Sequence, residues 1–322
     1  MIGRALQSYL DQFSRPVPTL AIDYVRWAVC LALSYKLLSG DFAIFVDLPP
    51  HLLELYPVDA HDSRYFHLMG VKPLIDLVTL HAVYWFVDLP SASVVSAIQW
   101  TTIGFLLAAA LFGSGPFRLI PIIAFLLVMH MWGFKLRSHH DLDDVEILQS
   151  LLLLYVFSNH REGLTLQRMA PDCRPSLEGG RMYAVFLMAF VIYYFPSGVN
   201  KLIDISISDW LAYPYTSILS ARMLNNVVGH YEYVLPMFEY LPIIDGANYI
   251  AVPPVYISHI LTPLILWRRA GIYFFIVFYT ALHLLSAGVG IFFFGNILAL
   301  ITLIPVYRLF EKRELVPSPV TT

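Results

Sequence analysis

Charged residues are scarce in this sequence. Only 13% of its 322 residues are Asp, Glu, Lys or Arg, whereas a soluble globular domain carries about a quarter. Hydrophobic residues make up 58% of the chain, and the mean hydropathy is +0.67. This composition excludes an ordinary soluble fold, and the net charge of −3 argues against a nucleic-acid partner.

Cysteine is scarcer still, with only Cys30 and Cys173 in the chain. We expect them at different levels of a membrane, so the sequence predicts no disulfide framework. The first 18 residues form an amphipathic lead without a small-residue cleavage site, so we expect no cleavable signal peptide. The 11 histidines include no H-x-x-H-H box, and we therefore expect no metal centre of the membrane di-iron kind.

What the sequence does contain is a series of apolar blocks, each long enough to cross a hydrocarbon core about 30 Å thick. They predict an all-α fold, a multi-pass transmembrane helical bundle of about eight spans in a single domain, 1–322. The segment Pro73–Leu89 is apolar but includes Asp76, His81 and Asp88, which favours one re-entrant or interfacial helix. The predicted spans are Thr19–Leu38, Ala92–Gly113, Pro116–Phe134, Leu142–Ser158, Arg181–Val199, Tyr249–Trp267, Ala270–Val289 and Ile291–Tyr307.

Basic residues gather in the connections that the span order places on one side, and this is the inner side by the positive-inside rule. The outer side then receives Ser138–Asp141 and Lys201, and His283 lies in the outer half of its span. Three polar groups from distant parts of the chain therefore meet at one level of the bilayer. The sequence predicts an outward-facing site in a membrane, for which we expect the cytoplasmic membrane of a bacterium.

Lys201 follows an apolar stretch that ends in Pro196-Ser197-Gly198-Val199-Asn200. One interpretation is an anchor, because a lysine at a helix C-terminus is favoured by the helix dipole and can extend to the interface. The other is a general base, because desolvation at a membrane rim favours the neutral amine. Pro196 and Gly198 weaken the helix and favour the second interpretation.

Two histidines lie inside predicted spans. His283 is either a neutral imidazole hydrogen-bonded to a neighbouring helix or part of a functional site, the two usual states of ionisable groups in a bilayer. His259 has the same alternatives, and Thr262-Pro263 after it predicts a kink that could open a cavity there.

Polar residues outside the spans complete the candidate site. His139 and His140 precede Asp141, which reads as a helix cap, and a divalent-metal site is the alternative. Trp210, with Asp209, Tyr213 and Tyr215, is typical of an interfacial aromatic belt, and a quinone- or sugar-binding surface is the alternative.

The run Gly198-Val199-Asn200-Lys201-Leu202, followed by Asp209-Trp210, resembles a motif of the vitamin K-dependent γ-glutamyl carboxylases and their HTTM-domain relatives. Ser138-His139-His140 and Phe278–His283 resemble two further segments of that family, so the likeness covers Lys135–Pro305. The spacing from Lys201 to Asp209-Trp210 is longer here than in the carboxylases.

The resemblance implies a lyase that uses a reduced, vitamin K-like quinone, with oxygen and carbon dioxide as co-substrates and no metal. Lys201 would deprotonate the quinone, and His140 would stabilise anionic intermediates, with His283 as a further polar partner. His139, His259 and Trp210 are the candidates for holding the quinone. The partners would be the lipid bilayer, a secreted peptide or protein substrate, and a quinone reductase. The alternative is a non-enzymatic accessory that matures or exports a secreted peptide, as in relatives resembling sporulation-delaying protein B.

Overall fold

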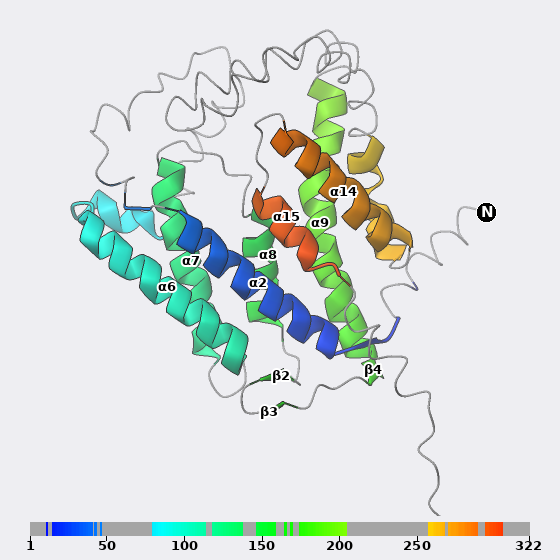
Figure 1. The fold of residues 1–322 in the computed structure, drawn as a ribbon, viewed down its shortest axis with the longest axis horizontal. Helices are drawn as coiled ribbons and strands as arrows, with labels where there is room; N and C mark the ends of the chain where they lie inside the picture. The colour runs from blue at the N-terminus through cyan, green and yellow to red at the C-terminus, as the bar shows by residue number, and fades with distance from the viewer. Residues whose placement is uncertain are drawn as a thin grey trace, which may run out of the picture. The chain divides into compact units, whose positions relative to one another are not determined.

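A computed structural model describes residues 11, 15–40, 42–43, 46, 79–113, 118–137, 146–158, 164–165, 168–169, 174–204, 257–267, 270–288 and 294–304. Most of these residues are helical (Figure 1), so the prediction of a mainly helical chain is confirmed. They belong to two compact units, one built around Val17–Gly179 and the other around Gly180–Ile304.

In the part of the first unit that the structure describes, four helices pack together: α2, α6, α7 and α8. α2 packs against α6 and α8, and α7 packs against α6 and α8 (Figure 1). Short antiparallel strand pairs join its loops: β1 with β4, and β2 with β3. The bounds are β1 Val17–Pro18, α2 Leu20–Ser39, the 3-10 helix η1 His81–Trp85, α6 Ala92–Phe112, α7 Leu119–Arg137, α8 Glu146–Phe157, β2 Leu164–Thr165, β3 Arg168–Met169 and β4 Pro175–Ser176.

The second unit is built on the long helix α9, Leu177–Asp204, all but three residues of which lie in it. A single turn at 257–260 leads into the 3-10 helix η4, Thr262–Trp267, and then into α14, Ala270–Gly288, and α15, Phe294–Ile301. α14 packs on η4 and on α15, and its aromatic residues contact those of α9. α9 continues as a helix through Pro196.

Six predicted spans agree with observed helices to within a few residues at most ends, and the described part of the predicted span Ile291–Tyr307 contains only the eight-residue α15. In the predicted span Tyr249–Trp267, the described part is a broken helix, because the turn at 257–260 gives way to η4. In the segment Pro73–Leu89, the described part contains only the five-residue η1, which is too short to cross a bilayer. Eight spans are not established, because within the described residues only Ala92–Phe112 and Leu177–Pro196 are both long and apolar enough to cross a membrane.

The described residues combine a buried apolar core with several exposed large apolar side chains and a few buried polar ones. Large apolar side chains point outward, among them Phe157 at 79% exposed and Val277 at 68%. Charged and polar side chains are buried instead, among them Asp23, Arg26 and His283. Hydroxyl groups in the helices donate to carbonyls one turn earlier, as Ser34 does to Cys30 and Thr102 does to Ile98, so their polarity is satisfied locally.

The backbone carbonyls at the end of α2 are also hydrogen-bonded within the protein. The side-chain amide of Gln99 on α6 donates to the carbonyl of Leu37 at 2.6 Å and to that of Gly40 at 3.0 Å. These carbonyls lie at the C-terminal end of α2, where carbonyls lack intrahelical donors. Within the described residues their backbone contact is a long one, from the Gly40 nitrogen to the Leu37 carbonyl at 3.4 Å. Gln99 therefore caps α2 from the neighbouring helix.

Candidate functional site

One face of α9 carries the chemistry of the second unit. Tyr194, Gly198 and Lys201 are spaced i, i+4 and i+7, which places their positions in one row along a helix. Lys201 lies in the last turn of α9, where the structure describes the backbone alone. Its register position therefore continues the row that Tyr194 and Gly198 begin.

Gly198 is the point at which α9 meets the turn at 257–260. A Cβ at residue 198 would lie 2.6 Å from Cβ of His259 and 3.2 Å from the backbone nitrogen of Ile260. Only glycine allows two backbones to approach this closely. The glycine of the family-like motif is thus required by packing, and it brings His259 against α9.

The helical turn at 257–260 is held by hydrogen bonds from the side chain of Thr262, which follows it in the chain. The hydroxyl of Thr262 donates to the carbonyl of His259 at 2.6 Å, with a longer contact of 3.3 Å to the carbonyl of Ser258. Ser258, His259 and Thr262 are all buried. The hydroxyl at the Thr262-Pro263 kink therefore satisfies backbone groups that the broken helix would leave without donors.

Tyr194 links α9 to α14. Its hydroxyl lies 3.2 Å from Nε2 of His283, and both side chains are buried. The Tyr194 ring also makes an edge contact with His259, at 5.5 Å between ring centroids. One tyrosine on α9 therefore contacts both of the histidines that the sequence analysis selected inside spans.

Aromatic rings surround this contact. Tyr279 lies 4.5 Å from Tyr194, stacks on Phe275 at 4.2 Å, and lies 5.9 Å from His283, all between ring centroids. Phe190 packs edge-on against Phe275. Imidazole and phenol groups in such surroundings are shielded from water, which strengthens their hydrogen bonds to any polar group that reaches them.

This arrangement is a packed aromatic cluster that contains a few polar groups. The rings make stacking and edge contacts with one another, and the Tyr194 hydroxyl and the two imidazoles are buried among them. Within the described residues, no group of three His, Cys, Asp or Glu side chains could hold a metal ion.

A second histidine cluster, in the first unit, has a different character. Nε2 of His81 donates to the carbonyl of His130 at 2.8 Å, and the Tyr84 hydroxyl lies 2.9 Å from Nε2 of His130. Nδ1 of His130 faces the carbonyl of Thr79 at 3.3 Å, so it must donate, and Nε2 accepts from Tyr84. The hydrogen bonds of these three ring nitrogens hold η1 against α7, so this cluster has a structural role.

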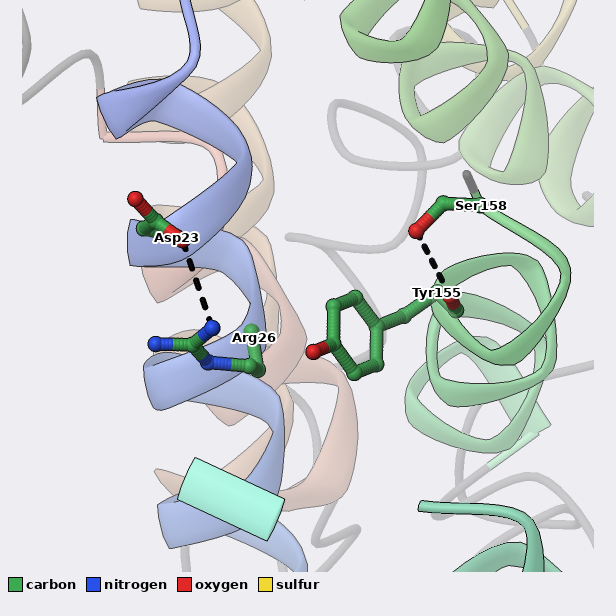
Figure 2. Close-up of polar contacts among 4 residues, drawn as sticks. All are labelled: Asp23, Arg26, Tyr155 and Ser158. Carbon is green, nitrogen blue, oxygen red and sulfur yellow. Dashed lines mark hydrogen bonds and ion pairs between the residues drawn. The ribbon is translucent and has the colours of Figure 1, made fainter. Parts of the chain in front are cut away.

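The most deeply buried charges lie on α2. Nη1 of Arg26 is 3.3 Å from a carboxylate oxygen of Asp23, and both side chains are 0% exposed. Figure 2 shows the Tyr155 ring of α8 directed at Arg26, with its centroid 5.9 Å from the guanidinium carbon. The sequence analysis missed this pair, although a carboxylate and a guanidinium three residues apart in an apolar helix are a readable signal.

Comparison with known proteins does not add a family to this geometry. No protein-family model matches the chain, and no curated protein and no solved structure is significantly similar to it. The functional argument therefore depends on the residues themselves.

The predicted site residues have different outcomes. The structure brings His259 and His283 to the helix that carries Lys201, and His283 is hydrogen-bonded to a neighbouring helix, as one of its two interpretations predicted. His139, His140 and Trp210 lie outside the described residues, so their roles stay predictions. Tyr194 was not selected from the sequence, although its spacing of seven residues from Lys201 could have indicated it.

Proposed function

We propose that this protein is a membrane-embedded enzyme that uses a reduced quinone and that its reaction resembles that of the vitamin K-dependent γ-carboxylases. The observation that supports the proposal is the contact between Tyr194 on α9 and His283 on α14. Tyr194 lies in the same helical row as Lys201. It supplies a polar group in aromatic surroundings two turns before the amine that the resemblance assigns as base.

A membrane location is supported by the arrangement of polarity. Trp100, in the middle of α6, is 64% exposed, whereas Asp23 and Arg26 in α2 are fully buried. In water such a surface would be unfavourable, because apolar area would stay hydrated while charges lost their hydration. In lipid the same arrangement is favourable, and α6 and α9 each have the length to cross.

In the proposed reaction Lys201 is the base. This role requires an uncharged amine, since only an uncharged amine can take the proton of the quinol hydroxyl. A reduced quinone, when bound, would supply the chemistry: its oxidation by molecular oxygen, which would leave one oxygen atom in the quinone product and one in water, would drive removal of a proton from a carbon acid of a peptide or protein, which would take up carbon dioxide. His283 and His259 supply polar contacts to the quinone, and His140 is proposed to stabilise the anionic intermediates.

The test is incorporation of labelled oxygen. Purified protein in lipid nanodiscs is incubated with a reduced naphthoquinone under ¹⁸O₂, and the quinone products are analysed by mass spectrometry. Simple autoxidation leaves the quinone unlabelled, whereas the proposed oxygenation places ¹⁸O in it. Lys201→Ala should lower labelled product by about 10²–10⁴-fold, the usual contribution of a general base.

Lys36 provides the matched control, because it is also a lysine in the last turn of an apolar helix. Lys36→Ala should leave the labelled product unchanged, and both variants should insert into the membrane normally. Equal labelled product from wild type and Lys201→Ala, or none from wild type, would reject the enzyme. Peptide export that survives Lys201→Ala would then favour the accessory function.

A further inference from the structure

The hydrogen bond between Tyr84 and His130 has a direction that a backbone carbonyl determines. Nδ1 of His130 faces the carbonyl oxygen of Thr79 at 3.3 Å. That oxygen can only accept, so in the neutral imidazole the proton lies on Nδ1 and Nε2 keeps its lone pair. The Tyr84 hydroxyl, 2.9 Å from Nε2, is therefore the donor. In addition to the structural role of this cluster, Tyr84 has a base already aligned with its proton.

A phenol with an aligned base can lose one electron without becoming a cation. Loss of the electron makes the phenol O–H strongly acidic, so its proton moves along the existing hydrogen bond to Nε2 of His130. The products are a neutral phenoxyl radical on Tyr84 and an imidazolium on His130, and the O–H bond is the only one that breaks. When an electron returns, the proton moves back to the phenol oxygen. A phenol without such a base would form a radical cation, which weakly polar surroundings destabilise.

The surroundings of the pair suit both products. The imidazolium keeps the Thr79 carbonyl as the acceptor of its Nδ1 proton, and a hydrogen bond from a charged donor is stronger than one from a neutral donor. The buried ring of Phe134 lies 5.2 Å from the His130 ring and 5.8 Å from the Tyr84 ring, between centroids. Packed rings limit the collisions of a phenoxyl radical with other molecules, so this packing lengthens the lifetime of a radical on Tyr84.

The residues beside Tyr84 in the chain determine which oxidant can reach it. Val83 and Val87 are exposed, Phe86 is 85% exposed, and Tyr84 itself is half-buried. An exposed apolar segment of this kind is typical of a surface that contacts a membrane, and this one lies a few residues before α6, which the proposed function places in lipid. The one-electron oxidants that arise in lipid are peroxyl radicals, which form when oxygen adds to carbon radicals of the acyl chains.

We propose that Tyr84, with His130 as its proton acceptor, is a one-electron redox site that reduces lipid peroxyl radicals. The peroxyl radical takes one electron from Tyr84 and one proton from the buffer at the membrane surface, and it leaves as a hydroperoxide. The phenol proton moves to His130 in the same step. The inference rests on the membrane location in the proposed function, and it is independent of the quinone reaction.

Electron paramagnetic resonance detects the phenoxyl radical. The full chain in nanodiscs is exposed under oxygen to a lipid-soluble azo initiator, whose carbon radicals become peroxyl radicals. Wild type should give the signal, and the radical should form more slowly in D₂O than in H₂O because the phenol proton moves with the electron. Tyr84→Phe, which keeps the ring beside Phe134, should lose most of the signal. His130→Phe should slow radical formation by about 10²–10⁴-fold, the usual contribution of a positioned base.

Tyr155→Phe is the matched control and should leave the signal unchanged. Tyr155 is also buried, but its ring centroid lies 5.9 Å from the guanidinium carbon of Arg26, and a neighbouring positive charge disfavours the loss of an electron.

Three results would overturn the redox role of Tyr84: no signal from wild type, equal signals from wild type and Tyr84→Phe, or equal rates in D₂O and H₂O. A water-soluble initiator that gives the same signal as the lipid-soluble one, at equal radical flux, would overturn lipid as the source of the oxidant. The ¹⁸O₂ experiment tests the quinone reaction separately, so failure of one proposal is distinguishable from failure of the other.

Discussion

Gly198 and His259 approach so closely that a single added carbon between them would collide. A Cβ at residue 198 would lie 2.6 Å from Cβ of His259, well inside van der Waals contact. The crossing of α9 and the turn at 257–260 therefore depends on the absence of a side chain at one position.

Replacing this glycine should loosen the crossing. We expect Gly198→Ala to lower the free energy of unfolding by about 1–3 kcal/mol, as overpacked core substitutions do. Thermal unfolding in detergent, followed by circular dichroism, measures the effect. Gly104→Ala is the matched control, because a Cβ at helical position 104 meets nothing within 4 Å and alanine is the better helix former. Equal effects of the two substitutions would contradict the close crossing.

Gly133 makes a similar contact in the first unit, this time with a side chain. A Cβ at residue 133 would collide with the His81 ring, so Gly133→Ala should displace η1 from α7 and destabilise the protein by about 1–3 kcal/mol. A Gly133→Ala, His81→Ala double variant removes the ring that the new Cβ would strike and leaves only the closer approach to Cβ of Thr79 at 2.9 Å. The cost of the alanine at 133 should therefore be much smaller in the His81→Ala background than in wild type, and an identical cost in both backgrounds would exclude the contact.

The buried charges of Asp23 and Arg26 should be coupled in their effect on stability, so that removing one charge costs more than removing both. Arg26→Met alone leaves the buried Asp23 carboxylate without its countercharge, which typically costs about 3–5 kcal/mol. The double variant Asp23→Leu, Arg26→Met removes both charges and should recover most of this loss. In a Cys173→Ser background, reaction of the buried Cys30 thiol with a fluorogenic maleimide during heating reports the unfolding of α2. A double variant less stable than Arg26→Met would show that the charges have a role beyond neutralising each other.

Gln99 should stabilise α2 through its C-terminal carbonyls. Gln99→Leu keeps similar volume but removes the donors to Leu37 and Gly40. We expect a loss of about 1–3 kcal/mol, the usual cost of leaving buried polar groups without partners. The same Cys30 assay measures it. Thr101→Val, on the same helix but exposed and bonded only to the carbonyl of Ala97, should have a smaller effect, and the reverse order would contradict the capping role.

The helices could largely be predicted from the sequence, because each one is a continuous apolar block bounded by polar or glycine-containing breaks. The predicted span Ala92–Gly113, for example, corresponds to α6, which ends where Gly113 adopts a positive φ of 66°. Glycine accommodates this conformation without strain. The break in the span that ends at Trp267 was indicated by Thr262-Pro263, but its 3-10 geometry was not.

The site was harder to predict, because its contacts join distant parts of the chain. Tyr194 and His283 are 89 positions apart, and nothing in one sequence states which face of α9 meets which face of α14. Each imidazole could be selected as an ionisable group in an apolar segment, but not its partner. The role of Gly198 as a close contact with His259, rather than a flexible point before Lys201, likewise required the three-dimensional arrangement.

The most direct measurement of the central claim is a cryo-electron microscopy structure of the protein in nanodiscs, saturated anaerobically with a reduced naphthoquinone. The account predicts quinol density with one oxygen within hydrogen-bond distance of the Lys201 amine. A Lys201 amine surrounded by water or directed into lipid, with no quinol density beside it, would contradict the account.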